Sequence, residues 1–178
     1  MTIKQLIIGC LQKLSSKQSG EWRDTKGINN EYVDKIIKIQ RENHGFLLGG
    51  SIALILGDVL PSRDIGDIDL IVSEDDFSQS NLYMKASESD AYGGLPSVDK
   101  QRYRCFYAYE KGIVINILVY ERGVTFRRKN ITLSDGSVIA CHNFDDILRW
   151  KEKYNRPKDI QDLKRIMDKA CEEAIFGG

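Results

Sequence analysis

The sequence predicts an α+β domain in which helices flank a mixed β-sheet and the C-terminal segment is helical. Helical and strand patterns alternate over the first part of the chain, two hairpin patterns follow, and two helical patterns end it. The chain has 178 residues, of which 42% are hydrophobic and 29% charged. That is enough apolar material for a packed core. The length suits one domain of ordinary size, or one domain with a small helical appendage.

The N-terminal part predicts two helices before the first strand. Apolar residues at helical spacing indicate a helix over residues 2–14, and a polar, glycine-containing stretch follows as far as Asn30. A second helix is expected from about Tyr32 to near Asn43. Residues 46–48 then have the character of a short buried strand.

The next part predicts a helix and a strand joined by a loop. Residues 51–56 suggest a helix that opens directly after a glycine pair, and residues 65–72 suggest a strand. The polar region 75–100 is expected to be a loop with one short helix at 76–84.

The second half of the chain predicts two hairpins followed by two helices. The hairpins pair residues 102–109 with 113–120, and residues 130–133 with 138–141. The helices cover residues 145–154 and run from Pro157 to about residue 174, since proline suits the first turn of a helix. Ile160, Leu163, Ile166 and Met167 are expected on one face of the last helix.

These elements suggest three regions. Residues 1–30 are expected to form an N-terminal helix and linker, residues 31–142 the core, and residues 143–178 C-terminal helices packed on the core.

Charge and cysteine content limit the classes of function. Lysine plus arginine and aspartate plus glutamate number 26 each, so the basic excess of a broad nucleic-acid-binding surface is absent, although a local basic groove is still allowed. No segment approaches the roughly 20 apolar residues that span a bilayer. The four cysteines are scattered without a Cys-x-x-Cys pair. Free thiols, a reducing cytoplasm and no membrane partner are therefore expected.

Two aspartates interrupt the predicted strand at residues 65–72. Successive side chains of a strand point to opposite faces, so Asp67 and Asp69 share one face. Two carboxylates so close repel each other, and each is costly to bury alone. A divalent cation relieves both costs, and Mg²⁺ or Mn²⁺ suits such oxygen ligands. The alternative is a strand face that is half exposed to solvent.

A glycine pair and a serine precede this strand. Gly49 and Gly50 allow the backbone to turn sharply and approach a ligand closely. The helix that follows them would present unpaired N–H groups to an anion, and Ser51 would add a hydroxyl to a phosphate or cap its own helix. Together with the paired acids, the pattern predicts a phosphate cradle beside a metal site.

Three motifs resemble the DNA polymerase beta-like nucleotidyltransferase superfamily. They are LLGGSIALIL (residues 47–56), DIGDIDLIV (residues 64–72) and RPKDIQDLKRI (residues 156–166), the last similar to a helix of the bacterial minimal nucleotidyltransferases. That branch includes antibiotic-modifying enzymes and the nucleotidyltransferase-like toxins and antitoxins of abortive-infection systems. The resemblance covers roughly residues 30–170 and implies a nucleotidyltransferase-like mixed sheet.

The resemblance also implies an activity. A magnesium or manganese ion held by Asp67 and Asp69 would carry ATP or another nucleoside triphosphate, with Gly49, Gly50 and Ser51 near its phosphates. The acceptor hydroxyl, on a small molecule, an RNA end or a protein, would attack the α-phosphorus, and pyrophosphate would leave. Further phosphate charge would be neutralised by basic residues, for which the resemblance leaves three candidates open: Arg63, Lys151 and Lys158.

Asn116 departs from the family pattern. The family has a third acidic residue on a later strand, and Asn116 occupies that position in the stretch GIVINILVY. An asparagine can ligate a metal ion or orient a hydroxyl, but it cannot take a proton at neutral pH. The sequence therefore leaves two further hypotheses open. One is a nucleotide-binding protein with weakened transfer, such as a toxin–antitoxin component, and the other is a structural domain whose paired acids face solvent.

Overall fold

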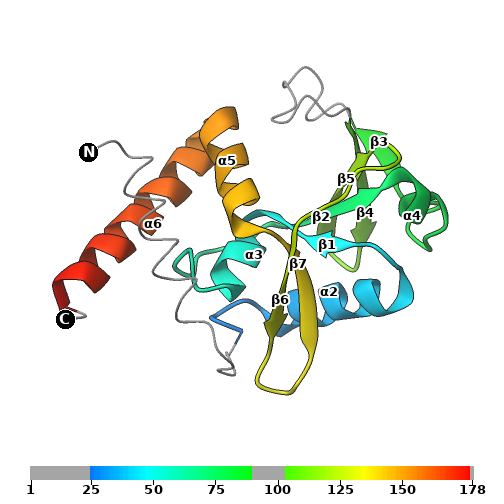
Figure 1. The fold of residues 1–178 in the computed structure, drawn as a ribbon. Helices are drawn as coiled ribbons and strands as arrows, with labels where there is room; N and C mark the ends of the chain where they lie inside the picture. The colour runs from blue at the N-terminus through cyan, green and yellow to red at the C-terminus, as the bar shows by residue number, and fades with distance from the viewer. Residues whose placement is uncertain (1–24, 90–102, 177–178) are drawn as a thin grey trace.

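The structure is a computed structural model that describes residues 25–89 and 103–176. Within these residues the fold is α+β, with five helices and a seven-stranded mixed sheet (Figure 1). The helices are α2 (Asn30–Glu42), α3 (Gly50–Leu56), α4 (Glu74–Ser78), α5 (Phe144–Tyr154) and α6 (Pro157–Phe176). The strands are β1 (Leu47–Leu48), β2 (Asp67–Ser73), β3 (Ser87–Ser89), β4 (Tyr103–Glu110), β5 (Ile113–Tyr120), β6 (Arg128–Thr132) and β7 (Val138–His142).

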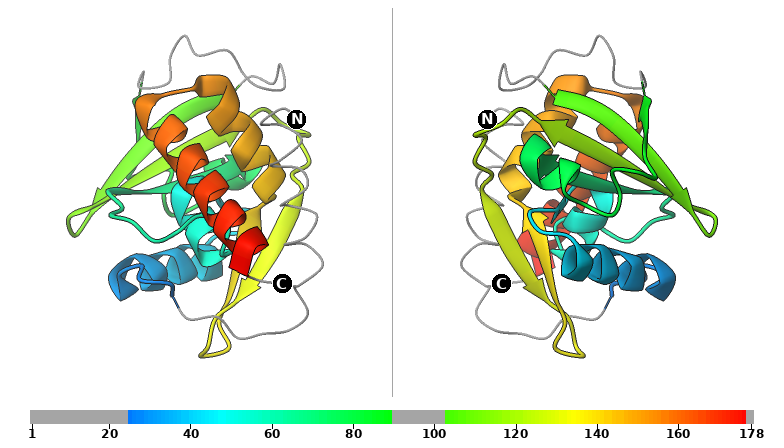
Figure 2. Two further views of the ribbon diagram at one scale, coloured as in Figure 1. Left: turned by 90° about the vertical axis from the view of Figure 1, so that its left-hand side faces the viewer. Right: turned by 90° about the vertical axis from the view of Figure 1, so that its right-hand side faces the viewer.

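The strands lie in the order β3-β4-β5-β2-β1-β7-β6. The β2–β5 and β1–β7 pairs are parallel, and the other neighbouring pairs are antiparallel. Helices α2 and α5 lie on opposite sides of the sheet, as the two side views also show (Figures 1 and 2). The long helix α6 packs against α5. The sheet is therefore covered by helices on both sides.

The two faces of the central strands differ in chemistry. Ile68 and Leu70 of β2 and Ile115 of β5 point into the main core and are fully buried. The side chains between them point to the opposite face, where Asp67 and Asp69 lie on β2. Alternation along a strand separates the apolar core from a polar surface only one residue away.

Local signals explain where the helices begin and end. The side chain of Asn29 accepts a hydrogen bond from the N–H of Glu31 at the start of α2, and Asn143 does the same for Asp145 at the start of α5. Asn155 adopts the left-handed conformation that ends α5. Pro157 then begins α6.

Most sequence-based element predictions are confirmed, with boundaries shifted by a few residues. The strand β3 was not predicted because it is three polar residues long and pairs only at the sheet edge with β4. The helix predicted over residues 2–14 lies outside the described residues, as does the end of the predicted loop at 75–100. No helix in the described part of the chain is long and apolar enough to cross a membrane.

One prediction about α6 was wrong. Ile160 was expected on the apolar face, but it is 49% exposed. The buried positions of the first two turns belong instead to two acids, Asp159 and Asp162, which are 0% and 1% exposed. The apolar contacts of the helix begin only further along, at Leu163, Ile166 and Met167.

Candidate functional site

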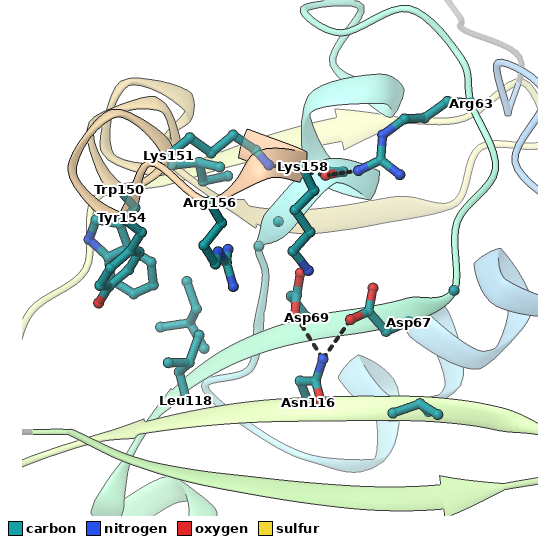
Figure 3. A pocket seen from close by; sticks show the side chains of 17 residues that line it. Arg63, Asp67, Asp69, Asn116, Leu118, Trp150, Lys151, Tyr154, Arg156 and Lys158 are labelled. Atoms are coloured by element: carbon teal, nitrogen blue, oxygen red, sulfur yellow. Dashed lines mark hydrogen bonds between the residues drawn. The ribbon is translucent and has the colours of Figure 1, made fainter. Parts of the chain in front are cut away.

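A pocket of about 430 Å³ opens on the polar face of the sheet (Figure 3). Its floor comes from β2 and β5, one side from the glycine turn before α3, and the other from α5 and the first turn of α6. The volume lies within the range of pockets for small organic ligands. All the residues that the sequence analysis assigned to the site line this pocket: Gly49, Gly50, Ser51, Arg63, Asp67, Asp69, Asn116, Lys151 and Lys158.

Asp67, Asp69 and Asn116 form the polar floor of the pocket. The parallel pairing of β2 with β5 places Asp69 directly beside Asn116. The Asn116 amide nitrogen donates to Asp67 Oδ2 at 2.8 Å and to Asp69 Oδ1 at 3.2 Å. The amide therefore bridges two carboxylates that would otherwise only repel each other (Figure 3).

The environment of Asp69 shifts the pKa of its carboxyl upward. Burial raises the pKa of the Asp69 carboxyl above its ordinary value, and the negative charge of Asp67 raises it further. The positive charge of Lys158, the hydrogen bond from Asn116 and the charge of Lys151 act in the opposite direction without cancelling this shift. A cation bound at this position would offset both the burial of the Asp69 carboxylate and its repulsion by Asp67.

Gly50 lies against the Asp69 carboxylate. Its φ is +60°, and a Cβ at this position would overlap the Asp69 carboxylate. The preceding Gly49 donates its N–H to the Asp69 carbonyl oxygen at 2.8 Å. The glycine turn is thus fixed to the same residue that forms the polar floor, so the two predicted halves of the site are adjacent in space.

Behind the glycine turn lies a buried group of charged and polar side chains, here called the Asp162 cluster. It consists of Ser51, Arg63, Lys151, Arg156, Asp159 and Asp162. Its members come from α3, the loop after α3, α5, and the residues that begin α6. The cluster therefore ties three helices and a loop together at one edge of the pocket.

Lys151 is at the centre of the Asp162 cluster and is 5% exposed. Its ammonium donates to Asp162 Oδ2 at 2.7 Å, to Asp159 Oδ1 at 3.3 Å and to Ser51 Oγ at 3.2 Å. An ammonium group has three N–H donors. These three partners use all of them, so Lys151 contacts phosphate only if one of these bonds breaks.

Ser51 and Arg63 are engaged in the same way. The Ser51 hydroxyl donates to Asp162 at 2.8 Å and accepts from Arg63 at 2.8 Å and from Lys151. Arg63 also donates to both oxygens of the Asp162 carboxylate and to the Asp64 carbonyl. The hydroxyl does not cap α3. A phosphate role for Ser51, Arg63 and Lys151 stays a prediction, and the described partners compete with it.

Arg156 and Asp159 join the Asp162 cluster to the start of α6. The Arg156 guanidinium donates to both oxygens of Asp159, with the shorter distance, 2.6 Å, from Nε to Oδ2. The same carboxylate oxygen accepts from the Arg156 backbone N–H at 3.4 Å, as in half of a capping box. An ion pair and a side-chain cap therefore stabilise the start of α6.

Lys158 differs from the other basic residues that line the pocket. Its side chain extends from the first turn of α6 toward Asp69 and Asp67 (Figure 3). The residue is exposed. None of the ion pairs within the described residues involves it. Of the three candidate phosphate-binding cations, it is the one that no described carboxylate neutralises at ion-pair distance.

The end of the pocket opposite Asp67 is apolar and aromatic. Trp150 and Tyr154 of α5 line it together with Leu118 from the sheet (Figure 3). Ile71, which also lines the pocket, belongs to the same apolar cluster as Leu118 and Trp150. The Trp150 ring stacks against Tyr120, with 5.9 Å between centroids and 24° between planes. The Tyr154 hydroxyl shares a hydrogen bond of 2.5 Å with the Tyr103 hydroxyl. The sequence analysis missed this wall, although Trp150 and Tyr154 are spaced for one helix face.

The residues of the floor suit one divalent cation. Asp67 and Asp69 offer carboxylate oxygens on one face, and a hard cation such as Mg²⁺ completes its shell with water and phosphate oxygens. The Asn116 nitrogen, which faces both acids, is a donor and cannot ligate a metal. With a cation bound, it would support the carboxylates from outside the coordination shell. In the described part of the chain, no three His, Cys, Asp or Glu side chains form a metal-binding group.

Comparisons with known proteins add no relative to this picture. No protein-family model matches the chain, and the searches of curated proteins and of solved structures give no significant match.

Proposed function

We propose that this protein is a metal-dependent nucleotidyltransferase with a DNA polymerase beta-like fold. It would transfer a nucleoside monophosphate from a nucleoside triphosphate to an acceptor hydroxyl. The observation that carries the proposal is the pairing of Asp67 and Asp69 with a glycine turn in one pocket. The carboxylates suit a cation, the glycines leave room for a ligand, and the adjacent aromatic wall suits a nucleobase.

Each part of the pocket has a place in this proposal. Asp67 and Asp69 would hold a magnesium ion, which would supply positive charge to the triphosphate. Gly50 lets the ligand approach the backbone, and Lys158 neutralises phosphate charge. Trp150 and Tyr154 receive the base. This order, from aromatic wall to paired acids, matches the order of base, sugar and phosphates in a nucleotide.

The chain contributes mainly position and charge to the transfer. The acceptor oxygen would form a bond to the α-phosphorus while the bond to the pyrophosphate oxygen breaks. The pyrophosphate would carry away the electron pair, and the hydroxyl proton would pass to solvent water. Asn116 orients the two carboxylates and takes no proton. The acceptor is a small molecule, an RNA end or a protein. We place the activity in the cytoplasm, where thiols such as the buried Cys105 stay reduced.

Transfer of label from triphosphates tests the proposal. The protein is incubated with each of four α-labelled nucleoside triphosphates, Mn²⁺ and a cell extract as the source of acceptors, and pyrophosphate release is measured alongside. The proposal expects labelled product and equal pyrophosphate with the natural protein, and loss of both with Asp67→Asn. Asp64→Asn is the matched control, because Asp64 is exposed and does not line the pocket. Activity that survives Asp67→Asn would contradict the proposal.

Asn116 favours a second candidate function, that of a nucleotide-binding protein with weakened transfer, such as a toxin–antitoxin component. Its amide already bridges the two acids by hydrogen bonds and brings no third negative charge. This candidate expects metal-dependent nucleotide binding without pyrophosphate release. It gains if Asn116→Asp creates transfer activity that the natural protein lacks, and it fails if the natural protein already transfers nucleotides.

A further inference from the structure

Three basic residues of the pocket form ion pairs with described carboxylates, and a fourth, Lys158, does not. Arg63 and Lys151 share the carboxylate of Asp162, at 2.7 Å each, and Arg156 is paired with Asp159. Lys158 forms no ion pair with any described residue and points to the two acids of the floor (Figure 3).

The backbone of Lys158 lies between residues that are held in place, whereas its side chain is exposed to solvent. The residue follows Pro157 and precedes Asp159, whose carboxylate is fully buried between Lys151 and Arg156. The lysine side chain itself is exposed, and its four-carbon stem allows the ammonium to move over several ångströms. Rotation of its side-chain bonds would therefore let the Lys158 ammonium occupy two positions without any movement of the backbone.

We propose that Lys158 is a tethered counter-ion for Asp67 and Asp69 in the ligand-free protein. A divalent cation would displace its ammonium, which would then bind the phosphates that arrive with the metal. This inference rests on the proposed function and deepens it, because it makes the metal and the nucleotide bind cooperatively. Lys158 would weaken the binding of the metal ion in the absence of nucleotide. It would strengthen the binding of the metal–triphosphate complex.

The alternative is that Lys158 affects only the phosphates. In that case its removal weakens nucleotide binding and leaves the affinity for the metal alone unchanged. The counter-ion role predicts that removal of Lys158 raises the affinity for the metal alone, because a competing positive charge is lost. It predicts that the same change lowers the affinity for the metal–nucleotide complex.

The test measures Mn²⁺ binding by electron paramagnetic resonance, with and without a non-hydrolysable triphosphate analogue. Lys158→Met is expected to bind Mn²⁺ alone roughly tenfold more tightly than the natural protein, and the Mn²⁺–nucleotide complex roughly tenfold less tightly. Lys158→Arg keeps the charge and is expected to resemble the natural protein in both measurements. Lys164→Met is the matched control, because Lys164 is exposed on the same helix and does not line the pocket.

The possible failures of the two proposals differ. If Lys158→Met binds Mn²⁺ alone no more tightly than the natural protein, while the natural protein binds Mn²⁺ with nucleotide, the counter-ion role is overturned and the proposed function stands. If Lys164→Met strengthens Mn²⁺ binding as much as Lys158→Met, the effect is one of net charge and the counter-ion role is also overturned. If none of these proteins binds Mn²⁺ under either condition, both proposals are overturned.

Discussion

Gly50 joins the two halves of the candidate site at the scale of a single residue. Its positive φ of +60° is a conformation that other residues adopt only with strain, and its missing side chain leaves the space that the Asp69 carboxylate fills. Glycine is therefore required here for two independent physical reasons.

Substitution of Gly50 separates these two reasons. Gly50→Ala is expected to push the Asp69 carboxylate out of place and to abolish metal-dependent nucleotide binding, with a loss of about 1–3 kcal/mol in the free energy of unfolding. Gly112→Ala is the matched control, because Gly112 has a φ of +85° but open space around its Cβ position. It is expected to lower stability through strain alone and to leave binding intact. Normal nucleotide affinity in Gly50→Ala would contradict this account.

Asn116 allows a second prediction at the residue scale. Asn116→Asp would replace two hydrogen bonds to Asp67 and Asp69 by like-charge repulsion, so the melting temperature of the metal-free protein is expected to fall. Addition of Mn²⁺ is expected to raise that temperature by more than in the natural protein, because three carboxylates bind the cation more strongly. Thermal unfolding with and without Mn²⁺ measures both effects. Equal Mn²⁺ shifts in the two proteins would rule out a metal at this position.

At the scale of elements, the first turns of α6 are held by charge rather than by apolar packing. Asp162 accepts hydrogen bonds from Ser51, Arg63 and Lys151, which belong to α3, the following loop and α5. Removal of one partner from such a buried network leaves the opposite charges uncompensated. The network therefore orients the start of α6, and with it the backbone of Lys158.

Asp162→Asn tests this role in stability. The change leaves Arg63 and Lys151 without their shared carboxylate, and the expected loss is about 3 kcal/mol or more in the free energy of unfolding. Asp168→Asn, an exposed position on the same helix, is expected to stay within about 0.5 kcal/mol of the natural protein. Urea unfolding at pH 7 compares the two variants. If both variants lose a similarly small amount of unfolding free energy, the Asp162 cluster contributes little to stability.

The same carboxylate predicts a pH dependence. Burial alone would raise the pKa of Asp162, but the hydrogen bonds from Arg63 and Lys151 outweigh it and hold the pKa below its ordinary value of 3.8. Its contribution to stability is thus present above the unfolded-state pKa and is lost as pH falls through the lower folded-state pKa. The difference in unfolding free energy between the natural protein and Asp162→Asn is therefore expected to narrow below pH 3.8. A constant difference down to the acid transition would contradict the assignment.

Sequence reasoning succeeded for elements whose signal is local. The hairpins of β4 with β5 and of β6 with β7 follow from apolar alternation around short turns, and the starts of α3 and α6 follow from glycine and proline. It failed where the partner lies far along the chain. Nothing in the sequence shows that Lys151 is the buried partner of Asp159 and Asp162, because that lysine belongs to another helix.

At the scale of the whole molecule, the sheet brings together residues that the chain keeps far apart. The parallel pairing of β2 with β5 places Asp69 beside Asn116, and the C-terminal helices bring Trp150 and Lys158 to the same pocket. The sequence predicted the paired acids and the glycine turn, because each is a short motif. It did not predict that Ser51, Arg63 and Lys151 would be saturated by Asp162, because that depends on tertiary packing.

The proposed function depends above all on Asp67 and Asp69 binding a divalent cation together with a nucleoside triphosphate. Isothermal titration of the non-hydrolysable analogue, with Mn²⁺ and with a chelator, measures this directly in the natural protein and in Asp69→Asn. We expect tight binding only in the natural protein with Mn²⁺, and weak binding in the other three combinations. Equal affinity with and without Mn²⁺, or undiminished Mn²⁺-dependent binding in Asp69→Asn, would contradict the account.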